Sequence, residues 1–439
     1  MSLAQPTAAE KAWQEDYAQH SDDLPGSAET WLADRRAAAM RTFTRLGLPH
    51  RRLESWKYTD LRTRLGALEP ARPSGRSVDL GAVPADPFAE VDCDRAVFVG
   101  GFFRPELSQL PRALEVTSLA AARLPWSKDL LGGELSSDHS LAALNLALAR
   151  DGVLIRVPKG MKSERPLHVA FVSPAAEGPA RAMHVRNAIL VEEGAQLTFL
   201  ESHRGQAGAG DLINLVWQLL VAESARLDHL KLIAESDRTQ HLSTAFAELG
   251  KGASYRPFIL TASAALARTE VITKLTGPEA QFALNAATLA NEREHIDITT
   301  FVEHAAPNAT SRQVVKSVIG GHGRGIYQGK IIVREGANGT DSHQLSKSIL
   351  LSPNAEADTK PELEIYADDV KCGHGATAGA LDENALFYLR SRGISEASAT
   401  AMLLEAFIED AVAAISNAEL RAAVSRVAAA KLERMGGAS

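Results

Sequence analysis

Residues 226–247 read RLDHLKLIAESDRTQHLSTAFA and hold two short segments of strand-like composition, Arg226–Ala234 and His241–Ala247. Successive side chains of an extended chain point to opposite faces, so alternate residues of a strand share a face. In the first segment this rule groups four residues on one face: Leu227, His229, Lys231 and Ile233. The alternation and the short length of both segments predict β-strands.

Comparable segments follow one another from Gly152 at a spacing of about 12–15 residues, over roughly 200 residues without a long helical pattern. Glycines punctuate their junctions: Gly194, Gly250, Gly252, Gly277, Gly320, Gly321 and Gly336. A sandwich, a barrel and a β-helix can each accommodate such a series. The long run of short strands favours the β-helix, in which each coil stacks on the preceding one. The predicted fold class is therefore mainly β, with a β-helix core at 151–380.

The first 150 residues read as a helical and mixed region. Helices are predicted at Glu10–Gln19, Ala28–Leu46 and Leu141–Arg150, with Ser27 as the N-cap of the second. Prolines and glycines between residues 69 and 87 indicate a linker.

The last region, 381–439, is predicted to be helical again. Its helices and caps are expected in this order: Asp382 before Glu383–Arg392, Ser395 before Glu396–Ile415, and a Ser416–Glu419 capping box before a helix ending near Gly436. The expected architecture is helices, β core, helices.

The chain has 439 residues, and its formal net charge of −7 gives no basic patch for nucleic acid. No segment approaches the ~20 consecutive apolar residues of a membrane span, and no secretory signal is recognisable at the N-terminus. Cys93 and Cys372 are too few for a disulfide framework. These features predict a cytoplasmic protein whose partners include neither nucleic acid nor a membrane.

Motifs of common enzyme classes are not found in the sequence. Gly320–Lys330 reads GGHGRGIYQGK, but Arg324 stands where a P-loop needs its first glycine, and Ile331 where Ser or Thr would hold magnesium. We expect these glycines to form a tight turn between strands. Asp368 and Asp369 are adjacent and point to opposite faces, unlike the converging carboxylates of a glycosidase. The sequence predicts no catalytic residue, so any ATP hydrolysis must come from a partner.

Cys372 and His374 form a C-x-H pair in an extended segment, where residues two apart share a face. A thiolate and an imidazole are suitable ligands for iron or zinc. Two ligands do not complete a site, so two interpretations stay open. The pair is either a structural cysteine beside an incidental histidine, or part of a site completed from elsewhere. Other histidines of the β region are interpreted mostly as surface or edge-strand residues: His203, His229, His295, His304, His322 and His343.

Residues 360–395 read KPELEIYADDVKCGHGATAGALDENALFYLRSRGIS. This block resembles the C-terminal signature of the SufB/SufD family of iron–sulfur cluster assembly proteins. Glu54–Leu61 (ESWKYTDL) and Leu403–Phe407 (LLEAF) resemble the SufD branch rather than the SufB branch. Gly373 is a departure, since many relatives have serine there. It adds backbone freedom without removing a ligand.

The resemblance implies a right-handed parallel β-helix flanked by helical regions, and a non-catalytic scaffold role in the SUF system. It implies pairing with SufB through the β-helix and binding of the ABC-type ATPase SufC through the C-terminal helical region. A homodimer is expected as an alternative when the chain is alone. Cys372 and His374 would hold an iron–sulfur cluster transiently at the SufB interface, and no cofactor is expected to be tightly bound to the isolated chain.

Two further interpretations concern aromatic and apolar residues. Trp56 and Tyr58 are expected to anchor the N-terminal region to the core. Apolar residues at helical spacing form a stripe on the predicted helix Glu396–Ile415. This stripe either packs the terminal helices together or docks SufC, and its partner-binding members are Met402, Leu403, Ala406 and Phe407.

Two rival functions are weaker. A SufB-like chain that holds a cluster alone is disfavoured by the presence of two cysteines only, because such sites usually draw on more thiolates. A β-helix enzyme acting on polysaccharides would need converging acids along a groove, and none is identified.

Overall fold

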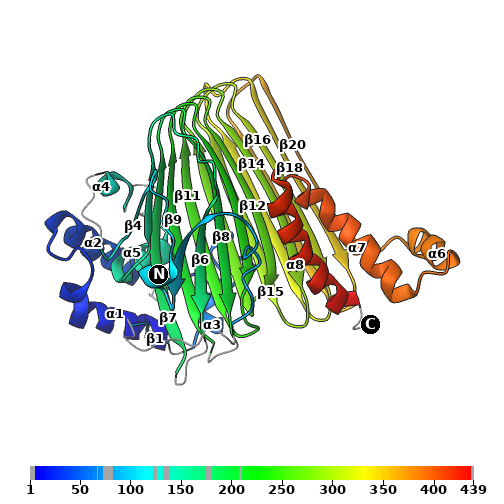
Figure 1. Ribbon diagram of the computed structural model, residues 1–439, viewed down its shortest axis with the longest axis horizontal. Coiled ribbons are helices and arrows are strands. Elements are labelled where there is room, and N and C mark those ends of the chain that lie inside the picture. The colour runs from blue at the N-terminus through cyan, green and yellow to red at the C-terminus, as the bar shows by residue number, and fades with distance from the viewer. Residues whose placement is uncertain are drawn as a thin grey trace.

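The strands form a parallel β-solenoid in which two sheets face each other (Figure 1). The structure is a computed structural model, and it describes residues 5–66, 68–72, 83–121, 126–131, 139–174, 179–206 and 210–436. The fold class predicted from the sequence, a β-helix flanked by helical regions, is confirmed. Residues 73–82 of the predicted linker lie outside the described residues.

One sheet, called sheet A here, has the strand order β19-β17-β15-β13-β11-β9-β7-β5-β4, with β1 beside β7. Its strands are β1 (Glu69–Pro70), β4 (Glu115–Ser118), β5 (Val153–Val157), β7 (Arg181–Val191), β9 (Leu212–Val221), β11 (Gln240–Leu249), β13 (Leu266–Leu275), β15 (His295–His304), β17 (Arg324–Val333) and β19 (Glu356–Ile365).

The other sheet, sheet B, has the order β20-β18-β16-β14-β12-β10-β8-β6-β2-β3. Its strands are β2 (Asp94–Val99), β3 (Phe102–Phe103), β6 (Leu167–Ser173), β8 (Gln196–Gly205), β10 (Arg226–Ala234), β12 (Ser254–Ser263), β14 (Gln281–Ala290), β16 (Thr310–Ile319), β18 (Thr340–Leu350) and β20 (Val370–Gly379).

Each coil stacks on the previous one in near-constant register. Leu227 of β10 lies beside Leu197 of β8 and Tyr255 of β12, and all three belong to the apolar core between the sheets. Thr288 Oγ1 donates to Ser317 Oγ, 29 residues further on, at 2.7 Å. The strand spacing noticed in the sequence is therefore half a coil, because each coil contributes one strand to each sheet.

The turns from sheet A to sheet B repeat a backbone conformation rather than a residue. Each of five successive turns has one residue with positive φ, and these residues differ in type: Gly194, Ser224, Gly252, Glu279 and Asn308. The left-handed conformation favours glycine but does not require it, which is why no fixed sequence motif marks the repeat. Gly320, Gly321 and Gly323 lie in the turn from β16 to β17, as predicted, whereas Gly325 and Gly329, which the prediction also placed in a turn, lie within β17.

The N-terminal helices cover the outer face of sheet A (Figure 1). They are α1 (Ala8–His20), α2 (Thr30–Leu46), α3 (Leu61–Arg64), α4 (Ser127–Leu130) and α5 (Ser140–Leu148). Ser27 is not the N-cap of α2, so that prediction is wrong. Residues 24–29 form successive turns, the N-cap position falls on Glu29, and the Ser27 hydroxyl donates to the carbonyl of Asp22 at 2.7 Å.

The C-terminal helices α7 (Glu396–Val412) and α8 (Ala418–Gly436) pack on the outer face of sheet B, and α6 (Glu383–Ser391) projects beyond it (Figure 1). Asp382 and Ser395 cap α6 and α7 as predicted. The Ser416–Glu419 capping box is wrong by one residue, because Asn417 Oδ1 accepts from the amide of Leu420 at 3.0 Å. Among the described helices, none has both the length and the apolar character needed to cross a membrane.

Candidate functional site

The solenoid has an open end, formed by β19 and β20. In the described chain β19 pairs only with β17, and β20 only with β18, so each leaves one edge without a neighbouring strand. Side chains that would be covered by a further coil are half-buried or exposed here, and Ile365 and Tyr366 remain 42% and 59% exposed. An unpaired strand edge is a template for another chain.

Cys372 and His374 both lie in β20, beside Ser342 and Gln344 of β18. Ser342 and Gln344 are fully buried, and Cys372 packs against the apolar core between the sheets. His374 follows Cys372 by two residues and shares its face. The two predicted ligands thus continue interior columns of the solenoid at the point where the coils stop, and His374 is exposed.

A polar column inside the solenoid leads up to Cys372. His304 Nε2 and Ser311 Oγ lie 3.0 Å apart, and Ser311 Oγ is 2.6 Å from Ser342 Oγ, which is in register with Cys372. Burial, with a smaller contribution from Asp341, raises the pKa of the Cys372 thiol. The thiol is therefore protonated at neutral pH in the isolated chain, and a metal bound there must displace its proton.

Cys372 and His374 do not complete a metal site with other residues that the structure describes. In the part of the chain that the structure describes, no third His, Cys, Asp or Glu forms a close ligand group with Cys372 and His374.

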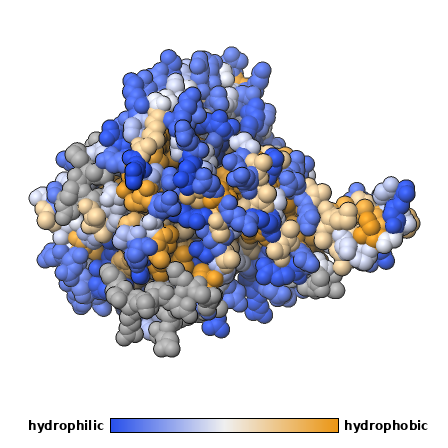
Figure 2. Space-filling view, in the orientation of Figure 1, coloured by the Kyte–Doolittle hydropathy of each residue, from blue (hydrophilic) through white to orange (hydrophobic). Residues whose placement is uncertain are grey.

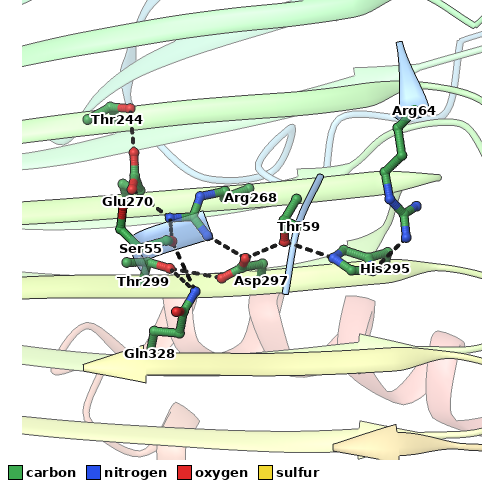
Figure 3. Close-up of polar contacts among 10 residues, drawn as sticks. All are labelled: Ser55, Thr59, Arg64, Thr244, Arg268, Glu270, His295, Asp297, Thr299 and Gln328. Carbon is green, nitrogen blue, oxygen red and sulfur yellow. Dashed lines mark hydrogen bonds and ion pairs between the residues drawn. The ribbon is translucent and has the colours of Figure 1, made fainter. Parts of the chain in front are cut away.

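The segment Glu54–Leu61 lies on the outer face of sheet A (Figure 3). Thr59 Oγ1 donates to Asp297 Oδ2 at 2.6 Å and lies 2.9 Å from His295 Nε2. The Arg268 guanidinium donates to the Ser55 carbonyl at 2.8 Å and stacks 3.9 Å from the centre of the buried Trp56 ring. The expected anchoring role of Trp56 agrees with these contacts.

A groove of about 660 Å³ runs beside this anchor, between residues 46–56, the start of α5 and sheet A. Four of its charged side chains already have partners: Glu54 and Glu362 pair with Lys360, Glu270 with Arg268, and Lys330 with Glu364. Each of these four charges is therefore balanced by an ion pair within the chain.

The C-terminal helices bury a different face from the one expected. In α7 the buried residues are Ala399, Leu404, Ile408, Ala411 and Val412. Met402 and Ala406 are exposed, whereas Leu403 and Phe407 are half-buried, so packing between the terminal helices does not account for the first two. Met402 and Ala406 line a groove of about 350 Å³ between α7 and α8. Figure 2 shows further apolar surface on the projecting α6 arm, where Phe387 is 73% exposed.

The interpretation of the β-region histidines as surface or edge residues is wrong for four of them. His203, His229, His295 and His304 are buried. His203 and His229 lie inside the solenoid, in what we call the interior cluster: Glu201, His203, His229, Lys231, Glu235 and His241. Sequence alternation had placed His229 and Lys231 on one face with Leu227, and that face is the interior.

Glu201 contacts three other residues of the interior cluster. Its carboxylate is 2.6 Å from His203 Nε2, 2.8 Å from His229 Nε2 and 2.6 Å from Lys231 Nζ. Burial lowers the pKa of His203 to about 4 and raises that of Glu235 to about 8. Glu201 and Lys231 can be buried as charged groups because they contact each other directly.

The chain is thus a helix-flanked parallel β-solenoid whose open end carries a thiol and an imidazole. Two protein families match it: the SufBD core domain of SUF system FeS cluster assembly over residues 171–407, and the SufBD N-terminal region over 7–67. The chain therefore belongs to the SufBD family, and it is an iron–sulfur cluster assembly protein.

Curated relatives span nearly the whole chain. An iron–sulfur cluster assembly SufBD family protein of Synechocystis is 29% identical over 412 residues, covering 91% of this chain and 90% of the relative. The iron–sulfur cluster assembly protein SufD of Escherichia coli is 29% identical over 392 residues, covering 87% and 89%. The chloroplastic protein ABCI7 of Arabidopsis thaliana is 27% identical, covering 88% and 83%.

Proposed function

We propose that this chain is the SufD-type, non-catalytic scaffold subunit of a cytoplasmic SUF complex. In this proposal its open end joins a SufB chain, its C-terminal helices bind the ATPase SufC, and ATP hydrolysis belongs to SufC. The observation that carries the proposal is the position of Cys372 and His374 on the interior face of an unpaired terminal strand.

Strand pairing supports the contact with SufB. The ten-residue strands β19 and β20 each offer a row of free backbone donors and acceptors along one edge. A second parallel solenoid can continue both sheets, and Ile365 and Tyr366 add apolar surface at the junction. When SufB is absent, a second copy of this chain can use the same edges.

Ligand chemistry supports a shared and transient cluster. Cys372 and His374 supply one thiolate and one imidazole, which suit iron, and the neighbouring chain has to supply the rest. The iron–sulfur cluster is the cargo of this site, and SufB ligands complete its coordination. Because burial raises the pKa of Cys372, the isolated chain holds the thiol protonated and binds the cluster weakly.

The exposed apolar residues of the C-terminal helices support the contact with SufC. Met402 and Ala406 line the groove between α7 and α8. Leu403 and Phe407 are half-buried residues of the same helix. Phe387 and Tyr388 extend the apolar surface onto α6. Aromatic residues and methionine are typical of the cores of protein–protein interfaces.

The proposal is tested by co-expression of the chain with SufB and SufC of its own organism, followed by native mass measurement. We expect one SufB, two SufC and one copy of this chain. Met402→Glu should lower the SufC content, whereas Ala430→Glu, on an exposed position of α8 outside the groove, should not. Recovery of this chain free of both partners would contradict the proposal.

The ligands are tested in the same complex by anaerobic cluster assembly. His374→Ala should leave the complex intact and reduce the cluster formed several-fold, while Thr377→Ala, on the other face of β20, should match the parent. A stable, stoichiometric cluster on the isolated chain would instead indicate a SufB-like scaffold that supplies its own ligands.

A further inference from the structure

The interior cluster contains two histidines and a glutamate that have no role in the proposed function. It lies around β8, β10 and β11, and in sheet B the strands β12, β14, β16 and β18 separate β10 from Cys372 on β20. Any function of this group is therefore spatially separate from the open end.

Three of its residues converge at one corner of a coil. His203 stands near the end of β8, Glu235 directly follows β10, and His241 is the second residue of β11. One ligand atom from each lies within 4.8 Å of the other two. His203 and His241 have no exposed surface, and Glu235 is 3% exposed.

Most polar atoms of this group have no hydrogen-bond partner in the described structure. They are His203 Nδ1, both carboxylate oxygens of Glu235 and both ring nitrogens of His241. An unsatisfied buried polar group costs about 1–3 kcal/mol, so five together at one point require an explanation. Glu235 also has no ion pair among the described residues, whereas Glu201 and Lys231 compensate each other.

The surroundings orient the group for a ligand. His203 Nε2 donates to Glu201 Oε1 at 2.6 Å, which leaves Nδ1 as the nitrogen with a free lone pair. A carboxylate that holds the far nitrogen is the usual support of a metal-binding histidine. The His203 ring is stacked on Phe171 with 4.8 Å between ring centroids, and His241 meets it edge-on at 4.4 Å.

We propose that His203, Glu235 and His241 form an internal site for one divalent transition-metal ion, Fe²⁺ or Zn²⁺. Two imidazoles and one carboxylate are a donor set common to zinc sites and non-haem iron sites. Metal–ligand distances of about 2.0–2.2 Å place neighbouring ligand atoms roughly 3.3 Å apart. Because the three ligand atoms already lie within 4.8 Å of one another, the side chains have to close by at most about 1.5 Å on binding. Because the site is fully enclosed, the ion enters while the coil folds and is retained afterwards.

The test measures the metal in the full-length chain. Protein produced with iron and zinc in the medium is passed through gel filtration with EDTA, and its metal is measured by mass spectrometry. We expect about one equivalent of iron or zinc per chain, and X-ray absorption should show nitrogen and oxygen ligands at about 2.0–2.2 Å without sulfur. The element found distinguishes the two ions.

Variants assign the site. His241→Gln should lower the bound metal at least tenfold, and the near-isosteric Glu235→Gln provides a second test if the first fails to fold. His168→Gln removes another fully buried histidine outside the group and should keep the metal. The double variant Cys372→Ser/His374→Ala should also keep it, which separates this site from the open end.

Two outcomes would overturn the proposal. One is less than a tenth of an equivalent of metal in the parent chain, both as isolated and after anaerobic refolding with excess Fe²⁺ or Zn²⁺; the group would then enclose water only. The other is full metal retention in folded His241→Gln and Glu235→Gln. Neither outcome bears on assembly with SufB and SufC.

Discussion

The closed middle of the solenoid (β7 to β12) and its open end use the same backbone geometry for different purposes. In the middle, Glu201 and Lys231 face the interior and are covered by the coils on either side. At the open end, Cys372 and His374 lie in other interior columns, beside Ser342 and Gln344, and no further strand of the described chain follows them. Whether an inward polar side chain is accessible to a second chain therefore depends on whether another coil follows.

The largest difference between the two regions should appear when a buried charge loses its partner. Lys231→Met leaves Glu201 without its cation in a fully buried position, and we expect the free energy of unfolding to fall by about 3–5 kcal/mol. Lys371→Met, at an exposed position of β20, should change it by less than about 0.5 kcal/mol. Urea unfolding followed by circular dichroism measures both, and similar losses would mean that the two regions do not differ in this way.

The second largest effect is expected from acid, which should lower the free energy of unfolding through the buried histidines. Burial lowers the pKa of His184 and His295 to about 3 and of His304 to about 4, below the value of about 6.5 in the unfolded chain. Between those values the unfolded chain binds more protons, so this contribution to stability is complete above about pH 6.5 and is lost as the pH falls toward 3–4. Each histidine contributes a slope of up to about 1.4 kcal/mol per pH unit.

His304→Gln isolates one of these contributions. The difference in unfolding free energy between parent and variant, measured at several pH values, should shrink steadily from pH 6.5 to pH 4. A difference that does not change with pH would show that His304 binds the same protons folded and unfolded.

The smallest effect on stability is expected at the open end. Cys372→Ser replaces a half-buried thiol by a hydroxyl of similar size, and we expect less than about 1 kcal/mol of change in the free energy of unfolding. The same variant should reduce cluster assembly in the complex with SufB and SufC. Large destabilisation with normal assembly would reverse the assignment of Cys372 from ligand to structural residue.

Local patterns in the sequence were enough for most of the architecture. The alternation in Arg226–Ala234 gave the strand and the correct grouping of Leu227, His229 and Lys231 on one face. It could not give their burial, because that depends on Glu201 in the previous coil, 30 residues away from Lys231. Histidines look like surface residues until such distant partners are known.

Two other differences from the predictions concern the helix caps and the buried face of α7. The N-cap position of α2 lies two residues after Ser27, and that of α8 lies one residue after Ser416. In α7 the buried residues that pack toward sheet B and α8 include Leu404 and Ile408, whereas Met402 and Ala406 of the predicted stripe are exposed. For the candidate site, alternation placed Cys372 and His374 on one face, but only the strand order shows that this face is left uncovered.

Every coil advances the solenoid by one strand spacing, so the number of coils sets the distance between two features along its axis. Helix α7 packs on β14 and β16, and β18 and β20 lie beyond them. At about 4.8 Å per strand, β20 lies roughly 10 Å from β16 along the stack. Inserting or deleting one coil between β16 and β20 would move the free edge of β20 by about 5 Å relative to α7. The distance between the C-terminal helices and this edge can therefore change only in steps of one coil.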